Sequence, residues 1–443
     1  MNGGRPYLSV VATARNDDHG GNPLYRTQLF IDGLVAQAER YRLPIELVLV
    51  EWNPPSDRPR LADVLRWPAS VWCDIRIIEV PHELHSTLEF SDRLPLYQMI
   101  GKNVGIRRAR GDFVVATNID ILLSKELMGF LASRSLDADC VYRADRVDVP
   151  AEIDPDWPLD RQLDFCRTKA IRINKYDMTV DLVTGRKYRI YKDVPIVLRV
   201  LPHYLVARTH LMRYLLWRTY AFFYWIIAGF NDPRRVPTRM KRRLRRLLEL
   251  TSGDAEAAGT AIAIAAAPRS ATRLLRLAVQ VVRLVFEDAR ARTREFLDAV
   301  EWEKSRIRLH TNASGDFTLM SSEAWLRAGG YAEFEMYSMH IDGLMLYQAH
   351  YAGVRERRLD YPVYHIEHGG GFKPESRDLA ERLERAAIPQ ISNEQLMAWI
   401  YEMYKTKKPI AFNDDDWGFA AESLPETRPL RAQVGAHAQT EVA

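Results

Sequence analysis

The side chains best suited to chemistry stand directly after short apolar runs of the sequence. Arg15 and Asn16 follow the first run, Glu51 follows the second, and Asn118 and Asp120 follow a later one. In an open α/β sheet, ligands bind beyond the carboxyl ends of the strands. If these runs are strands, their guanidinium, amide and carboxylate groups meet at one ligand-binding edge.

Short runs rich in β-branched residues must position these groups. Their bounded length and composition predict strands. Between the first two, apolar residues recur at helical spacing, which predicts a crossover helix. The pattern predicts an α/β fold with a mostly parallel central sheet flanked by helices. The predicted strands are residues 7–13, 45–50, 75–80 and 113–117, and the helix spans residues 24–40.

The pattern of residues 102–120 predicts a helix that ends at a glycine, followed by a strand that ends near a carboxylate. Gly105 and Ala109, four residues apart, would give the helix a smooth face toward the sheet, and Gly111 would end it. Asp120 then emerges at the ligand-binding edge. The plainer alternative is that Asp120 only caps the element that begins at Ile121.

This stretch, KNVGIRRARGDFVVATNID, resembles the A-type nucleotide-diphospho-sugar glycosyltransferases, especially their family 2-like group. In that family the pattern N-x-G-x-x-x-A-x-G-[DE]-[FY] leads into a strand ending in D-x-D. The resemblance implies that Asp120 holds a divalent metal, Mn²⁺ or Mg²⁺, against the pyrophosphate of the donor. It also implies donor-binding roles for Asn103 and for Asn118, which replaces the first acid of the D-x-D motif.

The resemblance places the nucleotide at the ends of the first two strands, beside Thr13, Arg15, Asn16 and Glu51. Arg15 can bind phosphate, and Glu51 can accept a hydrogen bond from a ribose hydroxyl or a base N–H. The sequence contains no GxGxxG after the first strand and no GxxxxGK[ST]. Dinucleotide-binding dehydrogenases and P-loop proteins therefore lack their central motif here.

Residues 315–353 resemble the second half of the same family, with GDFTLMSSEAW, a Gly-Gly-Tyr and then an acid that opens a helix. Asp342 matches the second acid of the family's E-D pair, Ile341 stands in place of its Glu, and Gly353 matches a later glycine. The resemblance implies that Asp342 is the general base of an inverting transfer. The alternative is that Asp342 only caps its helix.

Two further carboxylates and two histidines complete the candidate residues. Asp316 and Glu335 are expected near the acceptor. The run YPVYHIEHGGG resembles a late strand of the family in which a histidine completes the metal shell, so His365 is the expected ligand. Side chains three apart on a strand point to opposite faces, so His368 can share the ion only if the strand has ended. His368 is expected near the acceptor instead, and either histidine could be an ordinary core or surface residue.

A long segment of different composition separates the two halves. It contains a 17-residue aromatic run, 214–230, which is short for a transmembrane helix, and basic runs at 234–250 and 269–286. Such helices suit an anionic membrane surface. The alternative is a helical subdomain with solvated arginines. The expected divisions are a donor-binding half, 1–179, a helical insertion, 180–310, an acceptor and catalytic half, 311–375, a C-terminal helical segment, 376–421, and a disordered tail, 422–443.

Composition limits the class of protein. The 443 residues are 47% hydrophobic and 27% charged, which predicts a folded chain with a sizeable core. Three cysteines without a CxxC pattern, and no apolar leader at the N-terminus, favour a cytoplasmic location, with peripheral membrane attachment as an added option. The net charge of +4 is mild, and no nucleic-acid partner is expected because no binding module accompanies the arginines.

The resemblance implies a metal-assisted, inverting glycosyltransferase. It would move a sugar from a nucleotide diphosphate donor, with a UDP-sugar expected, to a hydroxyl of a glycan or lipid-linked acceptor. The alternative is an inactive relative that serves as a membrane or partner scaffold, because Asn118 and Ile341 depart from the family pattern.

Overall fold

A computed structural model describes most of the chain outside the long insertion. The described residues are 5–18, 20–190, 287, 290, 291, 294, 297, 298, 300–368 and 378–430. The chain divides into two units, one made of residues 1–192 and 308–443 and the other of residues 193–307. The aromatic and basic runs at 214–230, 234–250 and 269–286, for which membrane attachment was predicted, lie outside the described residues.

The strands of the first unit form one 12-stranded sheet. They are β1 (Leu8–Ala14), β2 (Ile45–Trp52), β3 (Cys73–Val80), β4 (Phe113–Thr117), β5 (Ile121–Leu123), β6 (Cys140–Val149), β7 (Arg172–Asn174), β8 (Met178–Asp181), β9 (Lys187–Arg189), β10 (Phe317–Ser321), β11 (Arg355–Ile366) and β12 (Glu426–Thr427). Their order is β12-β3-β2-β1-β4-β10-β6-β7-β8-β9, and β11 pairs with both β5 and β6.

The sheet is mixed, so the α/β class is confirmed and the prediction of a mostly parallel sheet is wrong. β3, β2, β1 and β4 are parallel, as is the β6–β11 pair. β10 is antiparallel to β4 and β6, and β7, β8 and β9 are successive antiparallel neighbours. The connections between β7, β8 and β9 are only a few residues long, and a parallel pair needs a much longer crossover.

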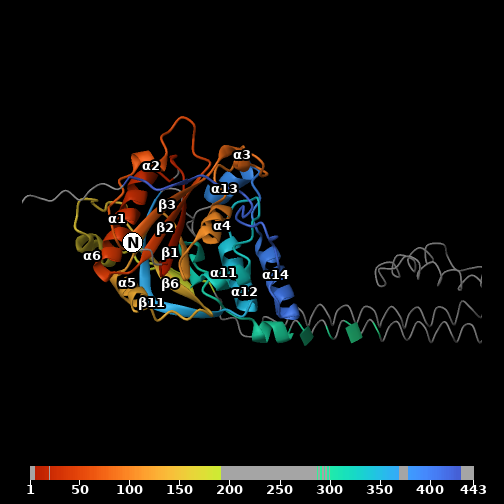
Figure 1. Cartoon of the computed structure of the whole chain (residues 1–443). Coiled ribbons are helices and arrows are strands. Elements are labelled where there is room, and N and C mark those ends of the chain that lie inside the picture. The colour runs from red at the N-terminus through yellow and green to blue at the C-terminus, as the bar shows by residue number, and fades with distance from the viewer. Residues whose placement is uncertain are drawn as a thin grey trace, which may run out of the picture. The chain divides into compact units, whose positions relative to one another are not determined.

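Helices cover both faces of the sheet, with α1 on one side and α4 on the other (Figure 1). The helices are α1 (Pro23–Tyr41), α2 (Leu61–Val64), α3 (His82–His85), α4 (Gln98–Arg108), α5 (Lys125–Ala132), α6 (Leu159–Thr168), α11 (Ser322–Ala328), α12 (Ile341–Tyr351), α13 (Asp378–Arg385) and α14 (Asn393–Thr406), with a 3₁₀ turn η2 (Ser314–Asp316).

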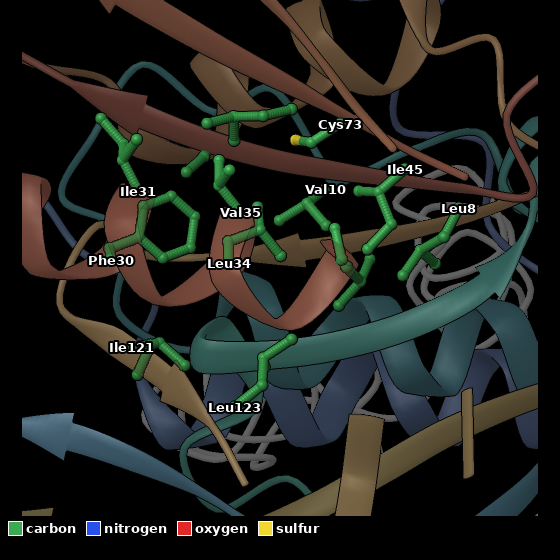
Figure 2. Packing of buried hydrophobic residues seen from close by; sticks show 14 of the residues in the cluster. Leu8, Val10, Phe30, Ile31, Leu34, Val35, Ile45, Cys73, Ile121 and Leu123 are labelled. Carbon is green, nitrogen blue, oxygen red and sulfur yellow. The ribbon is translucent and has the colours of Figure 1, made fainter. Parts of the chain in front are cut away.

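The face of the sheet beneath α1 forms the main hydrophobic core. Alternate residues of β1, β2 and β3 contribute to it, because side chains of a strand alternate between faces. Phe30, Ile31, Leu34 and Val35 of α1 point toward these strands (Figure 2). Each such side chain stabilises the fold by about 1.5–3 kcal/mol when fully buried. This packing fixes the carboxyl ends of the parallel strands, where the predicted site lies.

Glycines let α4 lie close to the opposite face. A Cβ at Gly101 would be 2.6 Å from Thr13 Cγ2, and one at Gly105 would overlap Val11. The smooth face is therefore made by Gly101 and Gly105, not by Gly105 and Ala109, because α4 ends at Arg108. Nor does a glycine end this helix. Gly111 is needed because a Cβ there would lie 2.6 Å from Ser9 N.

Two residues of the segment 422–443, for which a disordered tail was predicted, belong to the sheet as β12, and residues 431–443 lie outside the described residues. β12 pairs antiparallel with β3. Arg76, whose side chain is 3% exposed, forms ion pairs with Glu46 at 3.1 Å and Glu426 at 2.8 Å. Residues 422–430 thus cover the edge of β3 and help to neutralise a buried arginine. Among the described residues, no helix combines the length and apolar character needed to cross a membrane.

Candidate metal centre

Backbone pairing brings together three segments that are distant in sequence. β11 lies between β5 and β6, so that His365 is opposite Ile121 on one side and Asp148 on the other. The amide of Ile366 donates a hydrogen bond to the carbonyl of Asp120, 2.9 Å away. The sheet itself therefore sets Asp120 beside the end of β11.

Asp120, His365 and His368 form a compact group that we call the metal triad. Nε2 of His368 lies 3.3 Å from Asp120 Oδ2, and Nε2 of His365 lies 3.7 Å from the same oxygen. Ligands that share a small divalent ion, with bonds of about 2.1 Å, are separated by about 3.0–3.4 Å. The three side chains therefore fit one ion with little movement.

The end of β11 meets the condition under which both histidines can share one ion. β11 stops at Ile366, between the two histidines, so the alternation of side chains no longer separates them. His368, expected near the acceptor, joins the metal triad. Asp120 Oδ1 is buried and has no hydrogen-bond partner among the described residues. A buried carboxylate oxygen without a partner is costly, and a cation would satisfy it.

The charges around the metal triad keep its acid ionised. Burial alone would raise the pKa of Asp120, but His365, His368 and Arg26 lower it to well below its usual range. His365 has its pKa lowered by burial and by Arg146 and raised by Asp120 and Asp148, with a net rise. The site thus favours positive charge next to Asp120.

Asp148 fixes the orientation of His365. Its Oδ1 lies 3.0 Å from His365 Nδ1, which leaves Nε2 directed toward Asp120. Arg146 Nε is 2.8 Å from the same carboxylate, and Asn174 donates to its other oxygen. Burial would raise the pKa of Asp148, but Arg146 and His365 lower it to about 2. A carboxylate behind a histidine is the usual support of a metal ligand.

A second group, Asp148, His365 and Glu367, also has ligand atoms close enough to share an ion. Its central carboxylate already faces two guanidinium groups, with Arg146 at 2.8 Å and Arg172 at 3.6 Å. A further cation beside Asp148 would be repelled by both arginines. The metal triad around Asp120 is therefore the better site.

The amide of Asn118 contacts the carboxylate of Asp316. Its Nδ2 donates to Asp316 Oδ1 at 2.5 Å, and its Oδ1 accepts from Gln98 at 2.9 Å. Arg146 binds the other oxygen of Asp316 at 2.7 Å. Asp316, only 5% exposed, is thus bonded through both oxygens and links the start of β10 to residues that follow β4 and lie in β6.

Asp342 lies in the first turn of α12, but it does not cap that helix. The cap residue is His340, in the left-handed region with φ 69°. Oδ2 of Asp342 accepts hydrogen bonds from Gly315 N at 2.7 Å and Ser314 Oγ at 2.8 Å. Among the described contacts, none uses Oδ1. The carboxylate is held through one oxygen, and the other has no hydrogen bond among the described contacts.

The predicted nucleotide-binding residues do gather at one edge. β1 and β2 are in register, with Ala14 opposite Glu51. Arg15 donates to Asn53 O and Asn16 donates to Pro59 O, each at 2.8 Å. Glu51 accepts from Leu61 N at 2.9 Å, and burial raises its pKa to about 7.

These residues bind the segment that follows β2, and several of them are buried. Thr13, Asn16 and Glu51 have little exposed surface. Arg15, which is half-buried, also pairs with Asp17 at 2.9 Å. Asn16 and Glu51 are bonded to the segment after β2, whereas Thr13 packs against Gly101 of α4.

Two other predicted residues have structural partners. Asn103 is fully buried, and its amide donates to Tyr331 O and Glu333 and accepts from Tyr331 N, so it joins α4 to the segment after α11. Glu335 accepts a hydrogen bond from the backbone of Glu89.

A cavity of about 720 Å³ adjoins the metal triad. His368 and Glu367 form one wall, and the start of α1 with Tyr25 and Arg26 forms another. Residues 150–152 after β6 close it further. A molecule in this cavity would reach an ion on His368.

Three charged residues escaped the sequence argument. Arg146 and Asp148 alternate with valines in the apolar run that became β6, and this period of two indicates a strand with charges on one face. Lys102 lies next to Gly101 on the buried side of α4 and has no exposed surface. The only sequence signal for its burial is the pair Gly101 and Gly105, which let this part of α4 lie close to the sheet. The chain matches no model of a known protein family and no curated protein.

Proposed function

We propose that this protein is a metal-dependent glycosyltransferase of the A-type fold. It would transfer a sugar from a nucleotide diphosphate donor, with a UDP-sugar expected, to a hydroxyl of a glycan or lipid-linked acceptor with inversion. The metal triad of Asp120, His365 and His368 is the observation that carries the proposal, because the site lies at the carboxyl edge of the parallel strands. The sequence resemblance supplies the reaction class.

Of the two metals expected from the sequence, the donor set favours Mn²⁺. Two imidazoles and one carboxylate suit Mn²⁺ better than Mg²⁺, which prefers oxygen ligands. When bound, the ion would neutralise the charge that develops on the departing diphosphate. Asp120, His365 and His368 would hold it, and Asp148 would keep the ring of His365 in place.

Asp342 is the proposed base for the acceptor hydroxyl. Ser314 and Gly315 fix its Oδ2, so Oδ1 can accept a proton at a constant position. Asp342 and Asp120 both act to raise the pKa of Lys102, which indicates that the base and the metal triad share one electrostatic environment.

The test is transfer, or hydrolysis of the donor, across a panel of nucleotide sugars with Mn²⁺, Mg²⁺ or a chelator. We expect activity with Mn²⁺, its loss in Asp120→Ala, and retention in Asp112→Ala, a carboxylate at the opposite end of β4. Asp342→Asn should lower transfer while donor binding survives. An inert parent with every donor would refute the enzyme and favour the scaffold alternative.

A further inference from the structure

Lys102 is a buried cation for which the proposed reaction has so far given no role. Its side chain is 0% exposed, and Nζ donates a hydrogen bond to the carbonyl of Gly315 at 2.6 Å. Taking an ammonium group out of water costs several kcal/mol unless nearby charges compensate. Burial lowers the pKa of Lys102 to about 8, and Asp316, Asp342 and Asp120 oppose that effect.

Lys102 and the candidate base hold two sides of one glycine. The carbonyl of Gly315 accepts from Lys102, and its N–H donates to Asp342 Oδ2 at 2.7 Å. Ser314, the preceding residue, donates its hydroxyl to the same oxygen at 2.8 Å. The position of Asp342 therefore depends on the turn η2, and Lys102 holds Gly315, the central residue of that turn.

The residues on either side of Gly315 are held by other partners. Asp316, its last residue, is drawn toward Asn118 and Arg146. Arg143, also fully buried, binds the carbonyls of His310 and Asn312 just before the turn, at 2.9 and 3.1 Å. Gly315 lies between these two anchored parts, and Lys102 is the residue bonded to its carbonyl.

We propose that Lys102 is a positioning residue, which holds Gly315 and thereby fixes the place of Asp342 and balances its charge, without touching either substrate. This inference rests on the proposed glycosyl transfer. Lys102 makes no direct contact with the metal triad among those described, and it acts on Asp120 only through its charge. Its charge is faced by Asp316 from η2, Asp342 from α12, Asp120 before β5 and Arg143 from β6.

The first test is Lys102→Met, which keeps the length of the side chain and removes its charge. We expect kcat for transfer to fall on the order of 100-fold, as for a misplaced catalytic group. The KM for the donor should not change, and the Mn²⁺-induced thermal shift should not fall, because the variant removes a positive charge that acts on Asp120. The parent should lose activity above about pH 8 as the ammonium loses its proton, and this limb should be absent from the variant.

Two further variants keep the test decisive. Ser314→Ala removes one bond to Asp342 and leaves Lys102 intact, so it should lower kcat but keep the limb near pH 8. Lys125→Met removes a half-exposed lysine paired with Asp160 and should match the parent.

The outcomes separate this inference from the proposed function. A folded Lys102→Met with parental kcat and pH profile would overturn the positioning role alone. If that variant does not fold, an unaltered kcat in Ser314→Ala overturns it. A parent without transfer activity removes the proposed function and this inference with it.

Discussion

Mn²⁺ should stabilise the folded protein through His368, and this can be measured without knowing any substrate. A ligand that binds only the folded state at 100 times its Kd adds about 2.7 kcal/mol to the free energy of unfolding. For a unit of this size, 1 kcal/mol raises the midpoint of thermal unfolding by about 2 °C. Saturating Mn²⁺ should therefore raise that midpoint by about 5 °C.

His368→Ala removes one of the three ligands of the metal triad. If the affinity for Mn²⁺ falls by about 100-fold, as in the stronger losses seen even for supporting residues, the same Mn²⁺ concentration equals the new Kd. The stabilisation then drops to about 0.4 kcal/mol, or about 1 °C. The change in shift, about 4 °C, is well within the precision of thermal unfolding.

The assay compares metal-stripped protein with and without Mn²⁺ or Mg²⁺, followed by circular dichroism. His350→Ala is the matched control, because His350 lies in the last turn of α12 and outside both groups of metal-ligating residues. Mg²⁺ should give a smaller shift than Mn²⁺ since imidazole is a poor ligand for it. Equal Mn²⁺ shifts in the parent and in His368→Ala would refute the reasoning.

Four other measurements test residues and segments beyond His368. Asp148→Asn should weaken Mn²⁺ binding by about 10–100-fold in calorimetry, because His365 loses its supporting carboxylate; unchanged affinity would contradict that support. Asn118→Asp should lower the free energy of unfolding in urea by about 1–3 kcal/mol, because a second carboxylate would face Asp316, and an equally stable variant would contradict the charge argument. Burial raises the pKa of Glu333 to about 7, so the parent should lose stability between about pH 4.5 and pH 7 as this buried acid ionises. Glu51 contributes a similar loss, so Glu333→Gln should remove only the share due to Glu333 and be more stable than the parent at pH 8, by at most about 3 kcal/mol; urea midpoints that run parallel in parent and variant from pH 5 to 8 would argue against it. Deleting residues 214–286 should abolish flotation with anionic liposomes, whereas retained flotation would end the membrane hypothesis.

Local patterns were enough to predict the parallel part of the sheet. β1 to β4 and α1 follow from β-branched runs and helical spacing, and their observed bounds differ from the expected ones by a few residues. Asp120 and His365 were placed at a metal site because a family resemblance supplied what periodicity could not. The place of His365 beside Asp120 depends on the pairing of β11 with β5, including the hydrogen bond from Ile366 to the carbonyl of Asp120, and no local signal gives this pairing.

The remainder depends on pairing between distant segments. β10 enters the sheet antiparallel between β4 and β6, and β11 joins β5 to β6, which brings residues near 120, 148 and 365 together. Hydrophobicity alone would allow any of several apolar runs to take the places of β10 and β11 in the sheet. β12 escaped prediction for a different reason, because two polar residues form it and the buried charge of Arg76 supplies much of its attraction.

The buried acids of the site differ in a way that points to the metal. Asp148 and Asp316 each form an ion pair with Arg146, and their charge is balanced inside the protein. The ion-pair contacts of Asp120 are the two imidazoles, and its Oδ1 has no hydrogen-bond partner among the described residues. Buried ion pairs stabilise folds weakly, so this arrangement is a poor way to gain stability. Among the described residues Asp120, unlike the other two acids, forms no ion pair with an arginine, and its carboxylate could bind a cation.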